Sequence, residues 1–339
     1  MNFNSLNEIA LAMVAPGKGI LAADESTGTI GKRFQTMNTD STEESRRAYR
    51  DLLFSAPGMD EFISGVIMYD ETLRQSTAGG VPFPKHLADL GVIPGIKVDK
   101  GAKSLAGYDG ETITEGLDGL RERLDEYREL GALFAKWRAV IKIADNMPST
   151  SCISTNAHAL ARYAALCQEA GIVPIVEPEV LMDGDHDIDA CEEITSDVLN
   201  AVFNELYLQG VELEGMILKP NMIISATNCP EQASQQEVAE ATVRCLKHFV
   251  PASVPGIAFL SGGQSAEIAT QHLNLINNLG SLPWALSFSY GRALQQPVLQ
   301  AWGGKAENVE AAMKALYHRA RCNSAARDGK YSTEMEQAA

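Results

Sequence analysis

Basic residues are scarce in this 339-residue chain, and the first seventeen positions contain none; Lys18 is the first. Secretory signal peptides begin with basic residues and continue into an apolar run, so we expect no targeting segment and a cytoplasmic location. Across the chain, 28 Lys and Arg stand against 44 Asp and Glu, a net charge of −16. So acidic a surface repels phosphate backbones and argues against a nucleic-acid partner, while leaving room for a small basic pocket that binds a phosphorylated compound.

Long apolar runs and paired cysteines are missing as well. The longest stretch without a charged side chain, Ile268 to Gly291, contains one glutamine, three asparagines and a proline, so we expect no membrane span. The six cysteines are scattered and form no Cys-x-x-Cys pair. In a chain of this length such scatter indicates reduced thiols, again typical of the cytoplasm.

Eight short apolar runs recur at intervals that average about 38 residues, the length of one strand, one helix and two loops. Strands that alternate with helices predict an α/β fold with a parallel sheet. Eight of them favour a closed (β/α)8 TIM barrel over an open doubly wound sheet, and the first run lacks the Gly-x-Gly-x-x-Gly pattern of dinucleotide-binding folds. The runs are 19–24, 63–70, 94–99, 133–141, 173–180, 214–221, 256–263 and 284–291.

Helical patterns fill most of the intervals between these runs. Apolar side chains three and four positions apart predict a helix over Leu117–Leu130. Two capping boxes predict helix starts, Ser234 with Glu237 and Ser41 with Glu44. No linker or break in composition divides the chain, so we predict a single domain over 1–339, with an N-terminal helix at about 1–18 and a short C-terminal tail at about 322–339.

Charged residues are concentrated at the carboxyl ends of the predicted strands, where barrel enzymes carry their active sites. One charge at a strand end commonly faces water, but charges of both signs on five of eight strands converge on one mouth. Buried charges need partners, and such convergence shifts pKa values and binds anionic substrates. The residues are Asp24, Lys97, Asp99, Lys136, Arg138, Glu177, Glu179 and Lys219.

Lys219 is the most informative of these residues because it ends an apolar strand directly before Pro220. A neutral amine in a barrel mouth is a Schiff-base nucleophile for a ketone or aldehyde. A neighbouring cation such as Lys136, with partial desolvation, would lower the pKa of Lys219 and favour that form. The alternative is a structural ion pair between Lys219 and Glu177.

Two glycine-containing loops follow the seventh and eighth runs, where such barrels often bind phosphate. They are Leu260–Gly263 and Ser287–Arg292. Glycine lets backbone N–H groups approach an anion closely, and arginine adds a bidentate charge. A second basic group, Lys32 and Arg33, could hold a second phosphate or could simply be an exposed helix start.

Together these segments resemble the class I, Schiff-base-forming fructose-bisphosphate aldolases from about Gly17 to Tyr331. The resemblance implies a TIM barrel assembled as a homotetramer that needs no metal or other cofactor. It also implies a carbon–carbon lyase of glycolysis and gluconeogenesis that reversibly cleaves fructose 1,6-bisphosphate to dihydroxyacetone phosphate and glyceraldehyde 3-phosphate. The matching segments are 19–28, 95–101, 134–138, 173–179, 213–221, 259–265 and 284–294.

The resemblance implies catalytic roles for five residues. Lys219 forms the imine with the substrate C2 carbonyl, and Glu177 is the main acid and base. Asp24 holds or deprotonates the C4 hydroxyl. Lys136 keeps a positive charge beside Lys219 and Glu177, and Glu179 hydrogen-bonds within the same network.

The resemblance also implies a set of substrate-binding residues that divides between the two phosphates. The C1 phosphate would be bound by Ser261, Gly262, Gly291 and Arg292, with Ser289 in the same segment. The residues towards the C6 phosphate or nearby hydroxyls are Thr29, Lys32, Arg33, Lys97 and Arg138.

The C-terminal segment departs from the family pattern. Animal members end in a long flexible segment closing on a tyrosine that is credited with proton exchange on the enamine. This chain ends at Ala339 without that tyrosine, and Tyr331 aligns with an upstream position. Either another group protonates the enamine here, or that step is slower.

Three other functions remain to be compared. A metal-dependent aldolase would need clustered histidines, and the six histidines show no ligand spacing. A Schiff-base enzyme could instead act on fructose 1-phosphate or sedoheptulose bisphosphate, or catalyse a transaldolase-type transfer, although cations at both ends favour a bisphosphate. A scaffold protein on a degenerate barrel should have lost some of the catalytic set, and Asp24, Lys136, Glu177 and Lys219 are all present.

Overall fold

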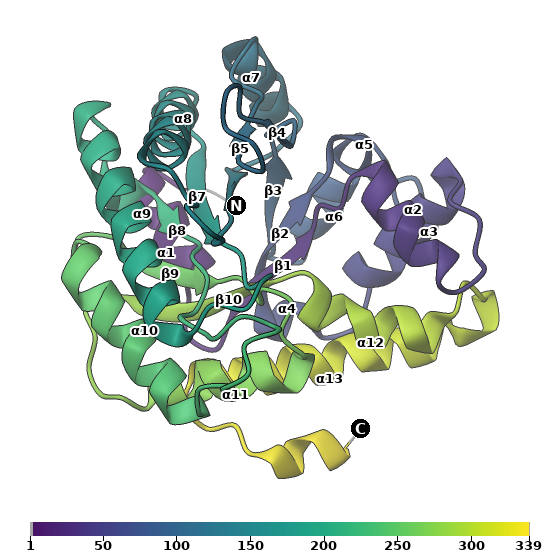
Figure 1. Ribbon diagram of the computed structural model, residues 1–339. Helices are drawn as coiled ribbons and strands as arrows, with labels where there is room; N and C mark the ends of the chain where they lie inside the picture. Colours follow the sequence, from purple (N-terminus) through teal and green to yellow (C-terminus); the bar gives the residue numbers. More distant parts are fainter. Residues whose placement is uncertain (1–2, 339) are drawn as a thin grey trace.

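Eight parallel strands close into a barrel in the computed structural model, which describes residues 3–338 (Figure 1). The order around the barrel is β1-β10-β9-β8-β7-β6-β3-β2, so the predicted (β/α)8 architecture is confirmed. Each strand lies within a predicted run except β3, which begins one residue earlier. The strands are β1 (Gly19–Ala23), β2 (Ile63–Met68), β3 (Ile93–Lys97), β6 (Phe134–Ile141), β7 (Val173–Val180), β8 (Ile217–Leu218), β9 (Gly256–Phe259) and β10 (Ala285–Tyr290).

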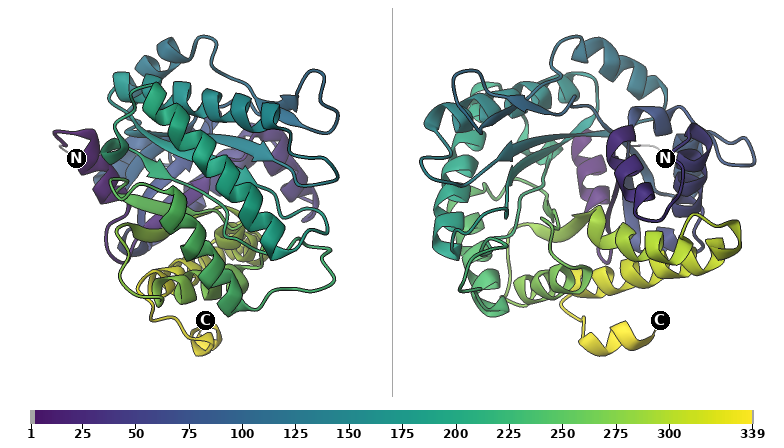
Figure 2. Two further views of the ribbon diagram at one scale, coloured as in Figure 1. Left: turned by 60° about the vertical axis from the view of Figure 1, so that its left-hand side comes forward. Right: turned by 45° about the vertical axis from the view of Figure 1, so that its right-hand side comes forward.

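Helices surround the barrel, and a short antiparallel pair, β4 (Ala102–Ser104) and β5 (Thr112–Thr114), is inserted after β3 (Figure 2). Within the described residues, no helix is both long and apolar enough to cross a membrane. The α-helices are α1 (Leu6–Met13), α2 (Thr27–Gln35), α3 (Glu43–Phe54), α4 (Met59–Phe62), α5 (Asp70–Leu73), α6 (Phe83–Asp89), α7 (Leu120–Glu129), α8 (Thr150–Glu169), α9 (Ile188–Leu208), α10 (Gln235–Phe249), α11 (Ala266–Asn277), α12 (Arg292–Trp302) and α13 (Val309–Arg327).

Of the two predicted capping boxes, one is confirmed and the other is displaced by one residue. The Ser234–Glu237 capping box is present at the start of α10, with both reciprocal hydrogen bonds. The Ser41–Glu44 box was wrong by one residue, since Thr42 is the N-cap of α3 and exchanges hydrogen bonds with Ser45. The serine at the third helical position makes the reciprocal bond here in place of a glutamate, which the Ser-x-x-Glu pattern overlooks.

The two chain ends also differ in extent from the expected segments. Helix α1 occupies only Leu6–Met13 of the expected N-terminal helix at about 1–18, and residues 1–2 lie outside the described part. Helix α13 continues to Arg327, so the segment after the last α-helix begins six residues later than the expected tail at about 322–339. Its final turn, η3 (Thr333–Ala338), is a 3-10 helix.

Large side chains fill the barrel interior where glycines leave room. The ring of Phe134 occupies the space beside Gly95, where a Cβ would lie 2.2 Å from a ring carbon. Helix α1 packs at the amino-terminal ends of the strands, and Gly256 leaves space there for Val14. The interior is therefore packed with side chains below the mouth, as in other barrels of this type.

Replacing Gly95 by alanine should destabilise the barrel, because the new methyl group collides with Phe134. Overpacking of this kind costs about 1–3 kcal/mol. We expect a lower urea midpoint without a change in slope. Gly28→Ala is the matched control, because no atom lies within 4 Å of its added Cβ. Equal midpoints for both variants would contradict the packing described.

Candidate active site

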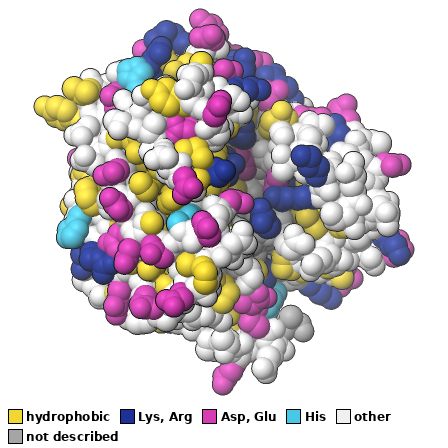
Figure 3. Space-filling view, in the orientation of Figure 1, with side chains coloured by type: hydrophobic (Ala, Val, Ile, Leu, Met, Phe, Trp, Pro, Cys, Tyr) yellow, Lys and Arg dark blue, Asp and Glu magenta, His cyan; other side chains and the backbone are white. Residues whose placement is uncertain are grey.

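A cavity of about 910 Å³ opens at the carboxyl ends of the barrel strands. In the space-filling view, Lys and Arg side chains gather around a hollow near the centre of this face (Figure 3). Residues of β1, β3, β6, β7 and β10 line it directly, and residues that follow β2, β8 and β9 complete it. The expected charged residues that line the cavity are Asp24, Lys97, Asp99, Lys136, Arg138, Glu177, Glu179 and Lys219.

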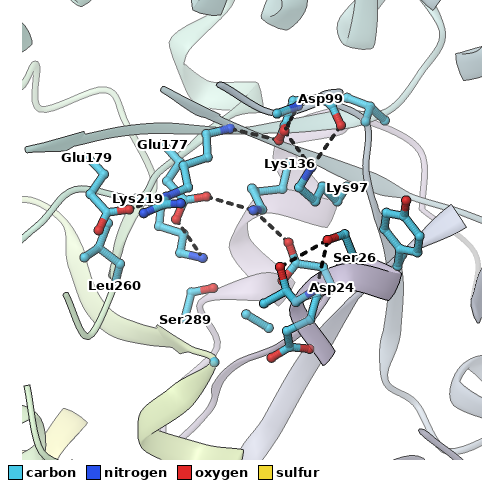
Figure 4. Close-up of a pocket in the computed structure, with 18 of the residues that line it drawn as sticks. Asp24, Ser26, Lys97, Asp99, Lys136, Glu177, Glu179, Lys219, Leu260 and Ser289 are labelled. Carbon is cyan, nitrogen blue, oxygen red and sulfur yellow. Dashed lines mark hydrogen bonds and ion pairs between the residues drawn. The ribbon is translucent and has the colours of Figure 1, made fainter. Parts of the chain in front are cut away.

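Four of these side chains form a chain of alternating charge (Figure 4). The Lys136 ammonium lies 2.7 Å from Asp24 Oδ2 and 3.2 Å from Glu177 Oε2. The other oxygen of the same carboxylate, Glu177 Oε1, lies 3.2 Å from the Lys219 ammonium. The sequence suggested a cation such as Lys136 near Lys219, with a Lys219–Glu177 pair as the alternative; in the structure Glu177 pairs with both lysines.

The four side chains are almost completely removed from solvent, with exposed fractions of 4–12%. Burial alone would lower the pKa of Lys136, but the carboxylates of Asp24 and Glu177 outweigh it and raise that pKa above its usual value. Lys136 therefore remains a cation through the neutral range.

The pKa values of the two carboxylates, Asp24 and Glu177, are shifted downward. Burial would raise the pKa of Asp24, but Lys136 and Lys219 outweigh it and hold the pKa well below its usual range. The pKa of Glu177 is likewise lowered, because Lys136 and Lys219 outweigh the effect of burial. Both groups are therefore ionised at neutral pH and act first as proton acceptors.

Two further ion pairs line the same cavity. The Lys97 ammonium lies 2.5 Å from Asp99 Oδ1, and Asp99 also accepts the backbone N–H of Arg138. The Arg138 guanidinium donates to Glu179, so Glu179 pairs with Arg138 and not with the Lys136 chain. The first pair lies at the end of β3 and the second joins neighbouring strands β6 and β7, so both cations stay beside the mouth.

The loops after β9 and β10 form a second, less acidic part of the cavity. Gly262 and Gly263 adopt positive φ angles of 55° and 80°, a backbone that side chains disfavour. The Arg292 guanidinium lies 3.6 Å from where a Cβ on Gly263 would stand. The Ser289 hydroxyl is buried without a hydrogen-bond partner among the described residues. Ser261 and Gly291 line the same part of the cavity.

Helices α11 and α12 begin beside these loops, so their free backbone N–H groups add positive potential there. With the Arg292 guanidinium and the Ser289 hydroxyl, this is an anion-binding arrangement suited to a phosphate. The predicted glycine loops thus lie where a phosphate group could be held.

Helix α2 brings only part of its predicted basic group to the cavity. Thr29 and Arg33, four residues apart, share the face that lines it. Lys32 is exposed and is not among the lining residues, because the helical turn directs it about 100° away from Arg33.

Glu25 and Ser26 are among the lining residues that were not expected from the sequence. Both follow Asp24 directly, and Ser26 is the N-cap of α2, with its hydroxyl 3.1 Å from that of Thr29. Their position directly after the strand-end Asp24 could have indicated that they lie at the mouth of the barrel.

The C-terminal segment lies on the outside of the barrel, below α13 in Figure 1. Tyr331 is 8% exposed, and its hydroxyl donates a hydrogen bond to Glu336. It does not line the cavity. Among the described residues, none beyond Arg292 lines the cavity. The aligned tyrosine is therefore occupied in fastening the chain end.

Only one group of residues in the described part has the composition and proximity of a metal site. His318, Cys322 and Glu336 place ligand atoms within 4.8 Å of one another. Glu336 is already engaged by the Arg319 guanidinium, which opposes a second cation. The group lies away from the cavity, whose described lining contains neither histidine nor cysteine.

The fold and the cavity define an α/β-barrel enzyme whose site carries a buried amine beside a carboxylate and cations for an anionic small molecule. Comparisons with known proteins agree with this class. The family model for class-I fructose-bisphosphate aldolase matches residues 5–339. A probable fructose-bisphosphate aldolase class 1 of Xanthomonas campestris is 60% identical over 98% of this chain and 99% of its own length.

Plant and structural relatives give the same result. A cytoplasmic isozyme of fructose-bisphosphate aldolase from Cicer arietinum is 58% identical over 93% of this chain and 88% of its own. A crystal structure of the Plasmodium falciparum fructose-bisphosphate aldolase, in a ternary complex with TRAP and a small-molecule inhibitor, superposes with a TM-score of 0.95. It is 51% identical and covers 96% of this chain and 95% of that one. The chain belongs to the class I fructose-bisphosphate aldolase family, a family of lyases.

The lowered carboxylate pKa values predict a loss of stability in acid. The unfolded chain binds protons at Asp24 and Glu177 below about pH 5, while the folded protein binds them only at lower pH, so stability is complete above that range and falls as the pH drops. Each group contributes up to about 1.4 kcal/mol per pH unit.

Urea unfolding at pH 7 and pH 4 measures this loss. We expect it to be smaller in Glu177→Gln, which has one titrating carboxylate fewer, than in wild type. Glu122→Gln, a change at an exposed position of α7, is the control and should keep the wild-type loss. An unchanged loss in Glu177→Gln would contradict the assignment.

Proposed function

We propose that this protein reversibly cleaves fructose 1,6-bisphosphate to dihydroxyacetone phosphate and glyceraldehyde 3-phosphate through a Schiff base on Lys219, in glycolysis and gluconeogenesis. The observation that carries the proposal is the contact of 3.2 Å between the Lys219 ammonium and Glu177 Oε1 in a buried site. Family membership and the basic groups at two parts of the cavity support the choice of a sugar bisphosphate.

The ion pair between Lys219 and Glu177 is compatible with catalysis because it is also a proton-transfer pair. Transfer of one proton from Lys219 to Glu177 leaves a neutral amine and a protonated carboxyl group. The amine adds to the C2 carbonyl, and Glu177 then protonates the carbinolamine hydroxyl, which leaves as water. Lys136 stays protonated and stabilises the Glu177 carboxylate that results.

The protonated imine then acts as the electron sink. Asp24, alone or with Glu177, takes the proton of the C4 hydroxyl, and the C3–C4 bond breaks towards the imine. Glyceraldehyde 3-phosphate leaves, and the lysine retains an enamine. Protonation at C3 and hydrolysis of the imine release dihydroxyacetone phosphate and restore the amine.

The two cationic parts of the cavity support a substrate phosphorylated at both ends. Ser261, Gly262, Ser289, Gly291 and Arg292 surround the part that we assign to the C1 phosphate. To the other phosphate we assign Thr29, Arg33, Lys97 and Arg138, which line the same cavity. Fructose 1-phosphate would leave the second set without an anion, and we expect it to be the poorer substrate.

Lys219→Arg should abolish cleavage of fructose 1,6-bisphosphate, because a guanidinium stays charged and cannot form the imine. We expect a fall in kcat of at least about 1,000-fold, with a chelator present throughout. The assay couples the triose phosphates to NADH oxidation. Lys103→Arg, on exposed β4, is the control and should retain wild-type activity. Full activity of Lys219→Arg, or loss of wild-type activity with the chelator, would refute the mechanism.

We also propose that the protein works in the cytoplasm as a homotetramer. The support is the family resemblance, the names of cytoplasmic relatives and an apolar end of α9. Tyr207 and Leu208 there are 82% and 71% exposed, the largest exposures among the large apolar side chains described. Exposed apolar groups of this kind are typical of association surfaces.

Substituting both residues should weaken association. We expect the Tyr207→Ser, Leu208→Ser double variant to sediment as a smaller species than wild type at the same concentration. Leu90→Ser, 39% exposed on the loop that follows α6, is the control. If wild type sediments as a monomer, the proposed tetramer is wrong. If the double variant sediments like wild type, Tyr207 and Leu208 do not lie in the association surface.

A further inference from the structure

Glu25 is a buried carboxylate in the cavity wall for which neither the resemblance nor the mechanism supplies a role. Its side chain is 6% exposed and follows Asp24 directly. One oxygen, Oε1, accepts from Arg33 at 2.5 Å and from Gln295 at 2.7 Å. The other, Oε2, accepts from Arg50 at 2.8 Å.

These three partners come from three different helices. Arg33 belongs to α2, Arg50 to α3 and Gln295 to α12. Gln295 is fully buried and also donates to the backbone carbonyl of Ala22 on β1 at 2.6 Å. Glu25 therefore fastens three helices to the end of one strand, directly beside the reacting groups.

The charges around Glu25 do not cancel. Arg50 is 3% exposed, and within the described residues Glu25 is the one carboxylate in ion-pair distance of it. Arg33 is 23% exposed and faces the cavity. Two guanidinium groups share one carboxylate, so the wall keeps a net positive charge. A guanidinium has five N–H donors, and Arg33 uses only one of them on Glu25.

We propose that Glu25 is a positioning residue that fixes the Arg33 guanidinium for the phosphate farther from the imine. The inference rests on the proposed function. Glu25 holds one edge of the guanidinium, and among the described residues no other acceptor engages the remaining N–H groups of this cavity-lining side chain. A guanidinium fixed before binding loses less conformational entropy when a phosphate arrives.

The consequence is a change in substrate preference and not a general loss of activity. Glu25→Gln removes the charge that fixes Arg33, so KM for fructose 1,6-bisphosphate should rise about tenfold. The value of kcat should change less than about threefold, because the chain from Asp24 to Lys219 is intact. KM for fructose 1-phosphate, which carries no phosphate at that end, should also change less than about threefold.

The ratio of the two KM values separates this role from a structural one. Both substrates carry the C1 phosphate, so any effect passed through Gln295 to α12 and Arg292 cancels in the ratio. A double-mutant cycle adds a second separation. In an Arg33→Ala background, Glu25→Gln should not raise the bisphosphate KM further, since its partner is gone.

Glu71 offers a matched control. It receives two hydrogen bonds from Arg46 of α3, at 2.7 and 2.6 Å, but does not line the cavity. Glu71→Gln should lower the unfolding midpoint and leave the KM ratio unchanged. If Glu25→Gln fails to fold because Arg50 is left buried and unpaired, the Glu25→Gln, Arg50→Met variant removes both charges and takes the same test.

Three results would overturn the inference. An equal rise in both KM values, or a lower midpoint with an unchanged ratio, would assign Glu25 a structural role only. A lower bisphosphate KM would mean that Glu25 competes with phosphate for Arg33. Wild type that cleaves neither substrate would instead defeat the proposed function, which distinguishes the two failures.

Discussion

The ammonium of Lys136 is the group on which the rest of the site depends. It lies between Asp24, which follows β1, and Glu177, on β7, and it helps to lower the pKa of both carboxylates, which burial alone would raise. Without it the barrel mouth would hold two buried carboxylates close together, an unfavourable arrangement. With it, Glu177 remains an acceptor beside Lys219, which is the condition for forming a nucleophilic amine.

The barrel makes this arrangement possible by bringing distant segments to one place. Strands β6 and β7 pair in register, with Arg138 opposite Glu177, so the cations of β6 lie beside the carboxylates of β7. The interior below is filled by apolar side chains, among them Phe134 beside Gly95. The packed apolar interior holds the strand ends in place, and the strand ends position the charged side chains. Ion pairs in the same wall, including Glu25 with two arginines, hold further cations beside the mouth.

The sequence predicts the strands and the charged mouth well, because both follow from local patterns. Apolar runs separated by helical intervals specify a (β/α)8 barrel, and alternation along a strand places Lys136 and Arg138 on one face. The individual pairings could not be predicted, because they depend on distances across the barrel. Glu177 bridges two lysines that seemed adjacent, and Glu179 pairs with Arg138. The exposure of Lys32 and the pairing of Glu25 with Arg33 likewise depend on how α2 is rotated over the mouth.

Borohydride trapping tests the central claim most directly, because it records the covalent bond itself. The protein is incubated with dihydroxyacetone phosphate and a chelator, reduced, digested and mapped by mass spectrometry. We expect one stable adduct on Lys219, formed in wild type and absent from a Lys219→Arg control. An active enzyme with no adduct, or with the adduct on another lysine, would contradict it.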